Sequence, residues 1–192
     1  MPGITIVATP GGASSNSFCT EAEYIAYTAT RLNVPEDTTV SGSACTETEK
    51  MALIEAAREL TNAPWAAQRT FLTQALAWPQ RYAMNPDAPA ITGITDIAQL
   101  YFDPGLAGEA ASIPARVKHA QIELALEFIK AGTTDLAAAD PNAGIIEKTV
   151  DVLTTRWSPY ARPTGWARFP RVLDYIAPML AGSAGGLEVV RS

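Results

Sequence analysis

The chain has 192 residues, 47% hydrophobic and 18% charged, which is enough to build the core of one domain with a long tail. Its formal net charge of −6 and pI of about 4.8 argue against polyanion binding by the chain as a whole. The charge is uneven, because residues 1–144 carry 8 Lys and Arg against 16 Asp and Glu, whereas residues 145–192 carry 6 against 4.

The side chains that metal and nucleophile chemistry need are scarce. The chain holds Cys19, Cys45 and one histidine, His119. A tetrahedral zinc site needs four ligands, so we expect no metal and two reduced, partly buried thiols. His119 falls between apolar stripes of a predicted helix, so we expect it to be structural, and we expect no catalysis and no cofactor. Met1–Ala8 lacks the charged start of a secretion signal, and no apolar stretch approaches the length of a membrane span.

The N-terminal third predicts an extended arm over residues 1–17 followed by two capped helices. Thr20 and Glu23 have the spacing of a capping box, in which side chains satisfy the free N–H groups at a helix start. This helix should run to about residue 32. Its predicted apolar face consists of Ala22, Ile25, Ala26 and Ala29.

The second capped helix should span about residues 47–62, since Thr46 and Glu49 repeat the capping spacing. The carboxylates of this region favour a solvated helix face: Glu47, Glu49, Glu55 and Glu59. A short helix is predicted from residue 64 to about 74, because proline suits a first helical turn. We expect Trp78 and Pro79 to form a structural motif, with the Trp78 ring in the core.

The longest predicted helix runs from Ser112 to Lys130, capped by Ser112 and ended by Gly132. A long loop, 82–111, precedes it and could hold a short helix near 94–101. Two apolar stripes mean that the helix is covered on most sides, as in a bundle centre or a subunit interface. The stripes are Ile113, Val117, Ala120, Leu124 and Phe128, and Ile122, Leu126 and Ile129.

The C-terminal third mixes strand and helix signals. β-branched residues alternate with polar ones in residues 147–157, which predicts a strand or one arm of a hairpin. A last short helix should run from Pro170 to about Leu180, with Val172, Ile176 and Leu180 on its buried face. The prediction as a whole is a mainly α fold: a small helical bundle with long loops, a strand or hairpin near 147–157, and an extended C-terminal tail.

Residues 156–171 interleave four arginines with aromatic side chains and contain no acid. Binders of single-stranded nucleic acid use this combination, and so do protein interfaces. A third possibility is core aromatics with surface arginines. The flexible tail after residue 181 ends in apolar side chains, which are typical of a docking segment. The candidate partner-binding residues are Trp157, Tyr160, Arg162, Trp166, Arg168, Phe169, Leu187, Val189 and Val190.

The order of these segments resembles the head–tail connector (adaptor) proteins of tailed bacteriophages, some of which are labelled DnaT-like single-stranded-DNA-binding proteins. In many relatives Arg follows Trp-Pro directly, whereas here Gln80 intervenes and Arg81 follows. The stretch 159–170 also looks longer than usual. The resemblance rests on the helix at 17–32, Ala52–Arg58, Gln74–Arg81, Ile113-Pro114 leading into Glu123–Leu126, the strand 148–157 and the C-terminal helix.

The resemblance implies a non-enzymatic virion protein at the head–tail junction, assembled in the host cytoplasm without contact to a membrane. Its copies would form a ring, expected to be a dodecamer, between the portal protein and a downstream tail, stopper or nozzle protein. Double-stranded DNA would pass through the central channel. The corresponding domain plan is an arm at 1–17, a connector domain at 18–180 with a strand and loop insertion at 145–170, and a docking tail at 181–192. The alternative function is a DnaT-like module that binds single-stranded DNA.

Overall fold

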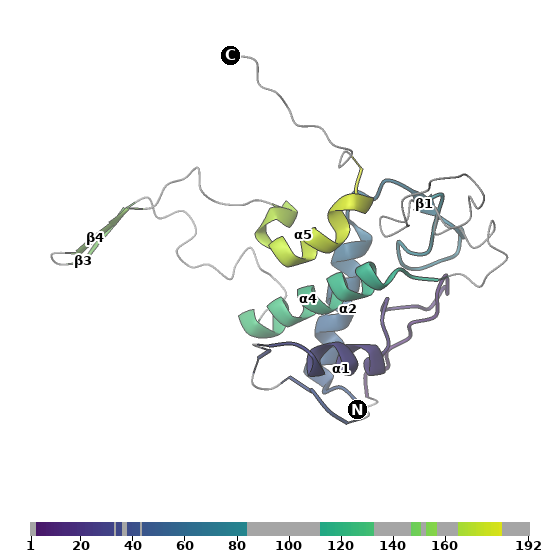
Figure 1. Ribbon diagram of the computed structural model, residues 1–192, viewed down its shortest axis with the longest axis horizontal. Coiled ribbons are helices and arrows are strands. Elements are labelled where there is room, and N and C mark those ends of the chain that lie inside the picture. Colours follow the sequence, from purple (N-terminus) through teal and green to yellow (C-terminus); the bar gives the residue numbers. More distant parts are fainter. Residues whose placement is uncertain are drawn as a thin grey trace, which may run out of the picture.

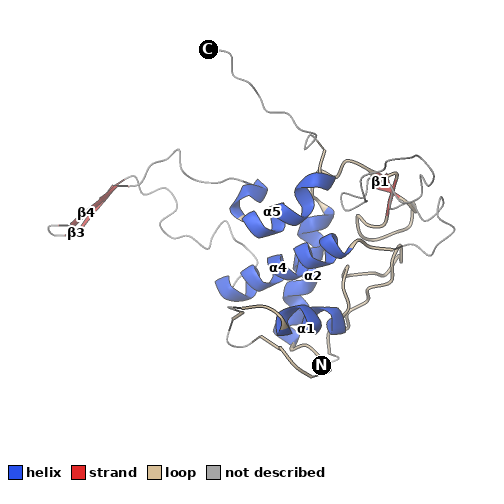
Figure 2. Cartoon of the chain, in the orientation of Figure 1, coloured by secondary structure: helices blue, strands red, loops and turns tan. Residues whose placement is uncertain are grey.

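The computed structural model shows a mainly helical body, as the sequence predicts (Figure 2). Helix α4 lies at its centre and contacts α1, α2 and α5 (Figure 1). The structure describes residues 3–32, 34–35, 38–42, 44–83, 112–132, 147–150, 153–156 and 165–181, with only the backbone of 147–150 and 153–156. The predicted short helix near 94–101 and the tail beyond residue 181 lie outside the described residues.

Helices α1 (Glu21–Ala29) and α2 (Glu47–Thr61) both begin with the predicted capping boxes. Helix α1 ends three residues earlier than expected, at Ala29. Its predicted face of small alanines is wrong, because Ala22, Ala26 and Ala29 are exposed. The buried side of α1 is formed by Tyr24, Ile25 and Thr28. The larger apolar area of the tyrosine ring outweighs the alanine methyl groups in setting which side of the helix is buried.

Helix α4 (Ala115–Ala131) carries the two predicted apolar stripes except for Ile113, which precedes the helix. All the stripe residues are buried apart from a half-buried Ile129. Gly132 ends the helix with φ 66°, a left-handed conformation that glycine adopts without strain. The predicted Ser112 cap is wrong, because Pro114 is the N-cap residue and makes no side-chain cap bond. Helix α4 is therefore covered on most sides by the other helices.

The predicted helix over 64–74 is wrong. This segment instead forms strand β1 (Gln68–Arg69), which pairs antiparallel with β2 (Gln80–Arg81). The Ala66 N–H donates to the Met179 carbonyl, and Trp65 forms a β-bridge with Leu180. These long-range partners take backbone groups that a helix would need, so tertiary pairing overrides the local helix signal.

Trp78 lies in the core, as the sequence predicts, with 1% of its surface exposed. Its ring meets Trp65 edge to face, with centroids 5.5 Å apart. Pro79 beside it is also buried. The Gln74 side chain closes the loop by donating to the carbonyls of Leu76 and Pro79.

The C-terminal part contains the expected hairpin, in which β3 (Glu147–Val150) pairs antiparallel with β4 (Leu153–Arg156). It lies apart from the helical body (Figure 1). A 3₁₀ turn, η3 (Gly165–Arg168), leads into α5 (Pro170–Ile176), whose Val172 and Ile176 are buried as predicted. Helix α5 is shorter than expected and passes into a second 3₁₀ turn, η4 (Ala177–Met179). Pro178 has no N–H for a helical bond, which explains why the α-helix does not reach Leu180.

Candidate nucleic-acid interface

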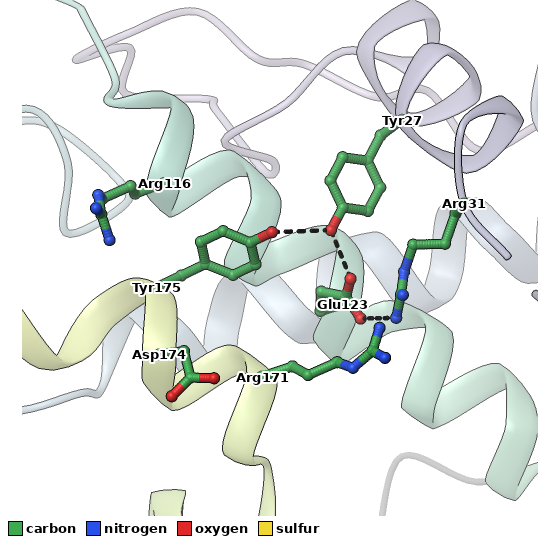
Figure 3. A pocket seen from close by; sticks show the side chains of 7 residues that line it. All are labelled: Tyr27, Arg31, Arg116, Glu123, Arg171, Asp174 and Tyr175. Carbon is green, nitrogen blue, oxygen red and sulfur yellow. Dashed lines mark hydrogen bonds and ion pairs between the residues drawn. The ribbon is translucent and has the colours of Figure 1, made fainter. Parts of the chain in front are cut away.

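Helices α1, α4 and α5 meet around a polar cleft of about 360 Å³ (Figure 3). We call it the tyrosine cleft. It is lined by Tyr27, Arg31, Arg116, Glu123, Arg171, Asp174 and Tyr175.

Helical spacing explains how these side chains come together. On α5, Arg171 is three residues before Asp174 and four before Tyr175, so all three share one face, next to the buried face of Val172 and Ile176. On α4, Arg116 and Glu123 are seven residues apart, which is close to two helical turns. Tyr27 lies on α1, and the side chain of Arg31 follows just after that helix ends.

The floor of the tyrosine cleft is a buried carboxylate. Glu123 is 3% exposed and accepts hydrogen bonds from the Tyr27 hydroxyl at 2.5 Å and from Nη2 of Arg31 at 2.6 Å. The Tyr175 hydroxyl lies 3.2 Å from the Tyr27 hydroxyl. Burial, followed by the hydrogen bond to Glu123, raises the pKa of Tyr27. Tyr27 is therefore a neutral hydrogen-bond donor throughout the physiological range.

Three rings stand together at the edge of the cleft. The His119 ring lies 4.8 Å from that of Tyr27 and 5.5 Å from that of Tyr175. Burial lowers the pKa of His119, although the nearby carboxylates of Glu123 and Glu23 oppose the shift. The imidazole is therefore neutral at neutral pH and acts as a further flat surface beside the two tyrosines.

A second hollow, of about 550 Å³, continues from the first and shares Tyr27 with it. We call it the α1–α4 groove. Lys118 donates to Glu23 at 2.5 Å on its wall. Burial opposes ionisation of Glu23, but the hydrogen bonds from Lys118 and Thr20 outweigh it and lower the pKa of Glu23. The groove is lined by Glu23, Ala26, Tyr27, Thr30, Ile113, Ala115, Lys118, His119 and Ile122.

The predicted arginine and aromatic segment reaches this region only in part. Trp166 and Phe169 are half-buried against the core, and the exposed Arg168 guanidinium lies 5.8 Å from the centroid of the Phe169 ring. A third hollow, of about 170 Å³, adjoins the tyrosine cleft through Glu123 and Arg171. The other candidate residues lie outside the described residues: Trp157, Tyr160, Arg162, Leu187, Val189 and Val190.

Sequence reasoning missed most of the tyrosine cleft. Its members span residues 27–175 and form no linear motif. The available signal was the polar or amphipathic residues beside the apolar stripes, such as Arg116 and Tyr175. The sequence does not show which helices pack together, so it could not predict that these residues line one cleft.

One of the four carboxylates predicted on a solvated face of α2 is buried. Glu55 pairs with Arg58 on the exposed side of the helix, as expected. Glu49 is instead 1% exposed and accepts hydrogen bonds from both the N–H and the hydroxyl of Thr39. It also accepts from the Tyr24 hydroxyl at 3.1 Å. The side chain therefore ties the loop before α2 to the helices, a role that helical periodicity does not reveal.

Other kinds of site have little support in the described part of the chain. Cys19 and Cys45 are free and buried, and burial raises the pKa of each thiol to about 12. No three Cys, His, Asp or Glu side chains of the described residues gather as a metal site. Among the described helices, none combines the length and the apolar character that crossing a membrane requires.

Comparison with known proteins identifies the family. The family described as "Putative DnaT-like ssDNA binding protein" matches residues 4–94 and 98–192. No curated protein and no solved structure matches the chain. Because the match covers nearly the whole sequence, the chain belongs to this family, described as "Putative DnaT-like ssDNA binding protein".

Proposed function

We propose that this protein binds single-stranded DNA along the tyrosine cleft and the adjoining α1–α4 groove. The observation that carries the proposal is the convergence of cations and flat rings from three helices on one surface. The family description supports it. Single-strand binders combine a positive track for the backbone with aromatic faces for the bases.

Each part of the surface has a chemical role in this proposal. Guanidinium groups of Arg116 and Arg171 are suited to phosphate oxygens, because their donors form a planar fork. The half-buried rings of Tyr27 and Tyr175 offer faces for bases, which any base sequence can use. The apolar floor of the α1–α4 groove, which includes Ile113 and Ile122, would shield a stacked base from water.

The local charge differs from that of the whole chain. The tyrosine cleft holds three arginines against two carboxylates, whereas the chain has a net charge of −6. The repulsion of the rest of the molecule limits affinity, so binding should be moderate and should weaken with salt. Three phosphate contacts by Arg31, Arg116 and Arg171 would give log K against log salt a slope of about −2.

Two substitutions test the surface directly. Replacing Tyr175 by Ala should cost about 1–3 kcal/mol of binding to oligo(dT), the usual range for one stacked base. Replacing Arg171 by Ala should weaken binding and make the salt slope shallower by about 0.7. Arg81→Ala is the matched control, since Arg81 is exposed on β2 and does not line the cleft. Fluorescence anisotropy with a labelled oligo(dT) measures all three, and equal affinities for all variants would refute the assignment of the site.

We also propose a second candidate function, a subunit of a phage head–tail connector ring. The resemblance in segment order supports it, and so do apolar side chains exposed along the β1–β2 region. Leu72 is fully exposed, Tyr82 is 64% exposed and Phe71 is 43% exposed. Exposed apolar surface of this kind is typical of proteins that assemble with partners. The partners in this proposal are other copies of the chain, the portal protein and a downstream tail protein.

Mass spectrometry of purified virions tests the connector proposal. A copy number equal to or simply related to that of the portal would support a ring at the head–tail junction. Absence from particles, with the protein left in the infected-cell lysate, would contradict it and favour the single-stranded-DNA function.

A further inference from the structure

The floor of the tyrosine cleft contains an unusual arrangement of charge. The Arg31–Glu123 ion pair is held with side-chain exposures of 21% and 4%. Figure 3 shows the guanidinium of Arg171 directed toward this same pair, with no interaction drawn between Arg171 and Glu123. Two guanidinium groups therefore face one buried carboxylate, and one of the two belongs to the exposed Arg171.

The donors of Arg31 are only partly used. Its Nη2 atom donates to Glu123, but its Nε atom is buried and has no hydrogen-bond partner among the described residues. A buried donor without an acceptor is costly and rare in folded proteins, so it calls for an explanation. A tetrahedral phosphate presents several acceptor oxygens and can serve more donors of a guanidinium than one carboxylate oxygen does.

We propose that Arg31 and Arg171 form a phosphate-binding subsite for the DNA backbone, in which Glu123 is the built-in anion that the phosphate displaces. This inference rests on the proposed single-stranded-DNA function. Glu123 holds Arg31 in place before DNA binds and keeps the cleft from taking up weakly charged anions. The same carboxylate repels an arriving phosphate, so it sets the affinity of the cleft.

Glu123 has one hydrogen bond that does not depend on Arg31. The Tyr27 hydroxyl donates to Oε1 of Glu123, whereas Arg31 contacts Oε2. The bond to Tyr27 does not involve the arginine, so the carboxylate retains one hydrogen bond after Arg31 turns to the DNA. The remaining bond from Tyr27 lowers the cost of leaving the buried Glu123 carboxylate when Arg31 moves to the phosphate.

The test is to remove the charge while retaining the shape. Glu123→Gln still offers an acceptor to Tyr27 but neither neutralises Arg31 nor repels phosphate. We expect about tenfold tighter binding of fluorescein-labelled dT15 at 50 mM NaCl, the size of effect expected when one like charge beside a bound phosphate is removed. Glu59→Gln is the matched control, because it removes the same charge from an exposed position on α2 that lines none of the three hollows, and its affinity should change by less than about twofold.

A double variant and a competitor identify the partner. In the double variant Glu123→Gln/Arg31→Gln, the tenfold gain in affinity for dT15 should disappear, because that gain comes from the Arg31 guanidinium that Glu123 no longer neutralises. Competition with labelled dT15 on Glu123→Gln then distinguishes the two sources of phosphate. If millimolar inorganic phosphate displaced the labelled strand as completely as unlabelled dT15 does, the subsite would bind free phosphate, and the assignment to the DNA backbone would be wrong. A gain that persists in the double variant would overturn the role of Arg31.

The failure of this inference can be distinguished from the failure of the proposed function. Wild-type binding of dT15 with no gain in Glu123→Gln would overturn the inference alone. No binding by any variant would overturn both. Should Glu123→Gln not fold, the arginine Nε–Hε signals of the wild-type protein give the answer by NMR. The Arg31 signal should shift on addition of dT15 and that of Arg58 should not, and an unchanged Arg31 signal would refute the exchange.

Discussion

At the scale of single residues, one buried amide joins three parts of the chain. Gln121 is fully buried on α4, and its Oε1 atom accepts from the backbone N–H groups of Phe18 and Cys19. Its Nε2 atom donates to the Ser17 hydroxyl and to the Leu53 carbonyl, each at 2.8 Å. The amide oxygen therefore accepts two hydrogen bonds and the amide nitrogen donates two. These four bonds connect the N-terminal segment and α2 to the central helix.

Replacing Gln121 by Leu should destabilise the fold by about 3 kcal/mol, because it removes four buried hydrogen bonds and leaves the Phe18 N–H without its acceptor. The loss should be measured by urea unfolding. Hydrogen exchange gives a second readout, since the amide of Phe18 should lose protection while those at the centre of α2 keep theirs. The Cys19 amide should lose less, because it also donates to the Ser17 hydroxyl. Unchanged protection at Phe18 would contradict the anchoring role.

Glu49 gives stability a pH dependence. Burial opposes its ionisation, but hydrogen bonds from Thr39 and Thr46 outweigh it and hold the pKa of Glu49 below its ordinary value of 4.5. A carboxyl with a lowered folded-state pKa stabilises the fold above its unfolded pKa, and that contribution is lost as the pH falls through the folded value.

Glu49→Gln should therefore cost about 2 kcal/mol at pH 7, since an amide nitrogen cannot accept those bonds. The difference in unfolding free energy between this variant and the wild type should shrink as the pH falls below about 4.5. Urea titrations between pH 3 and pH 7 measure it. A difference that stays constant across that range would show that ionised Glu49 has no special role.

At the scale of elements, the sequence predicted what local chemistry controls. The capping boxes at Thr20 and Thr46, the stripes of α4 and the glycine that ends it all depend on residues close together in the chain. The segment 64–74 was mispredicted because its backbone pairs with residues 179–181, more than a hundred positions away. No local pattern reports that pairing.

The same segment carries a testable packing prediction. Trp78→Ala should destabilise the protein by about 3–5 kcal/mol, since it opens a cavity beside Trp65 in the core. Leu72→Ala is the control in the same loop, and it should change stability by less than about 0.5 kcal/mol because Leu72 is fully exposed. Thermal unfolding followed by circular dichroism compares them, and similar melting temperatures for the two variants would refute the assigned role of Trp78.

At the scale of the whole molecule, the candidate site depends on packing rather than on motif. The segment 156–171 drew attention because its chemistry is contiguous, whereas the tyrosine cleft is assembled from α1, α4 and α5. The net charge of −6 also gave no sign of a cleft with more arginines than carboxylates, because a net charge sums over all surfaces of the molecule. The fold class followed from the sequence, but the surface that we assign to DNA required the arrangement of the helices.

The most direct test of this assignment is a titration of the wild-type protein with labelled oligo(dT) and with a duplex of equal length. The titrations should be repeated between 50 and 200 mM NaCl. We predict saturable binding of the single strand, weaker binding of the duplex, and a salt slope of about −2 for the single strand. Equal affinity for both forms, or no binding at 50 mM NaCl, would contradict a single-stranded-DNA cleft.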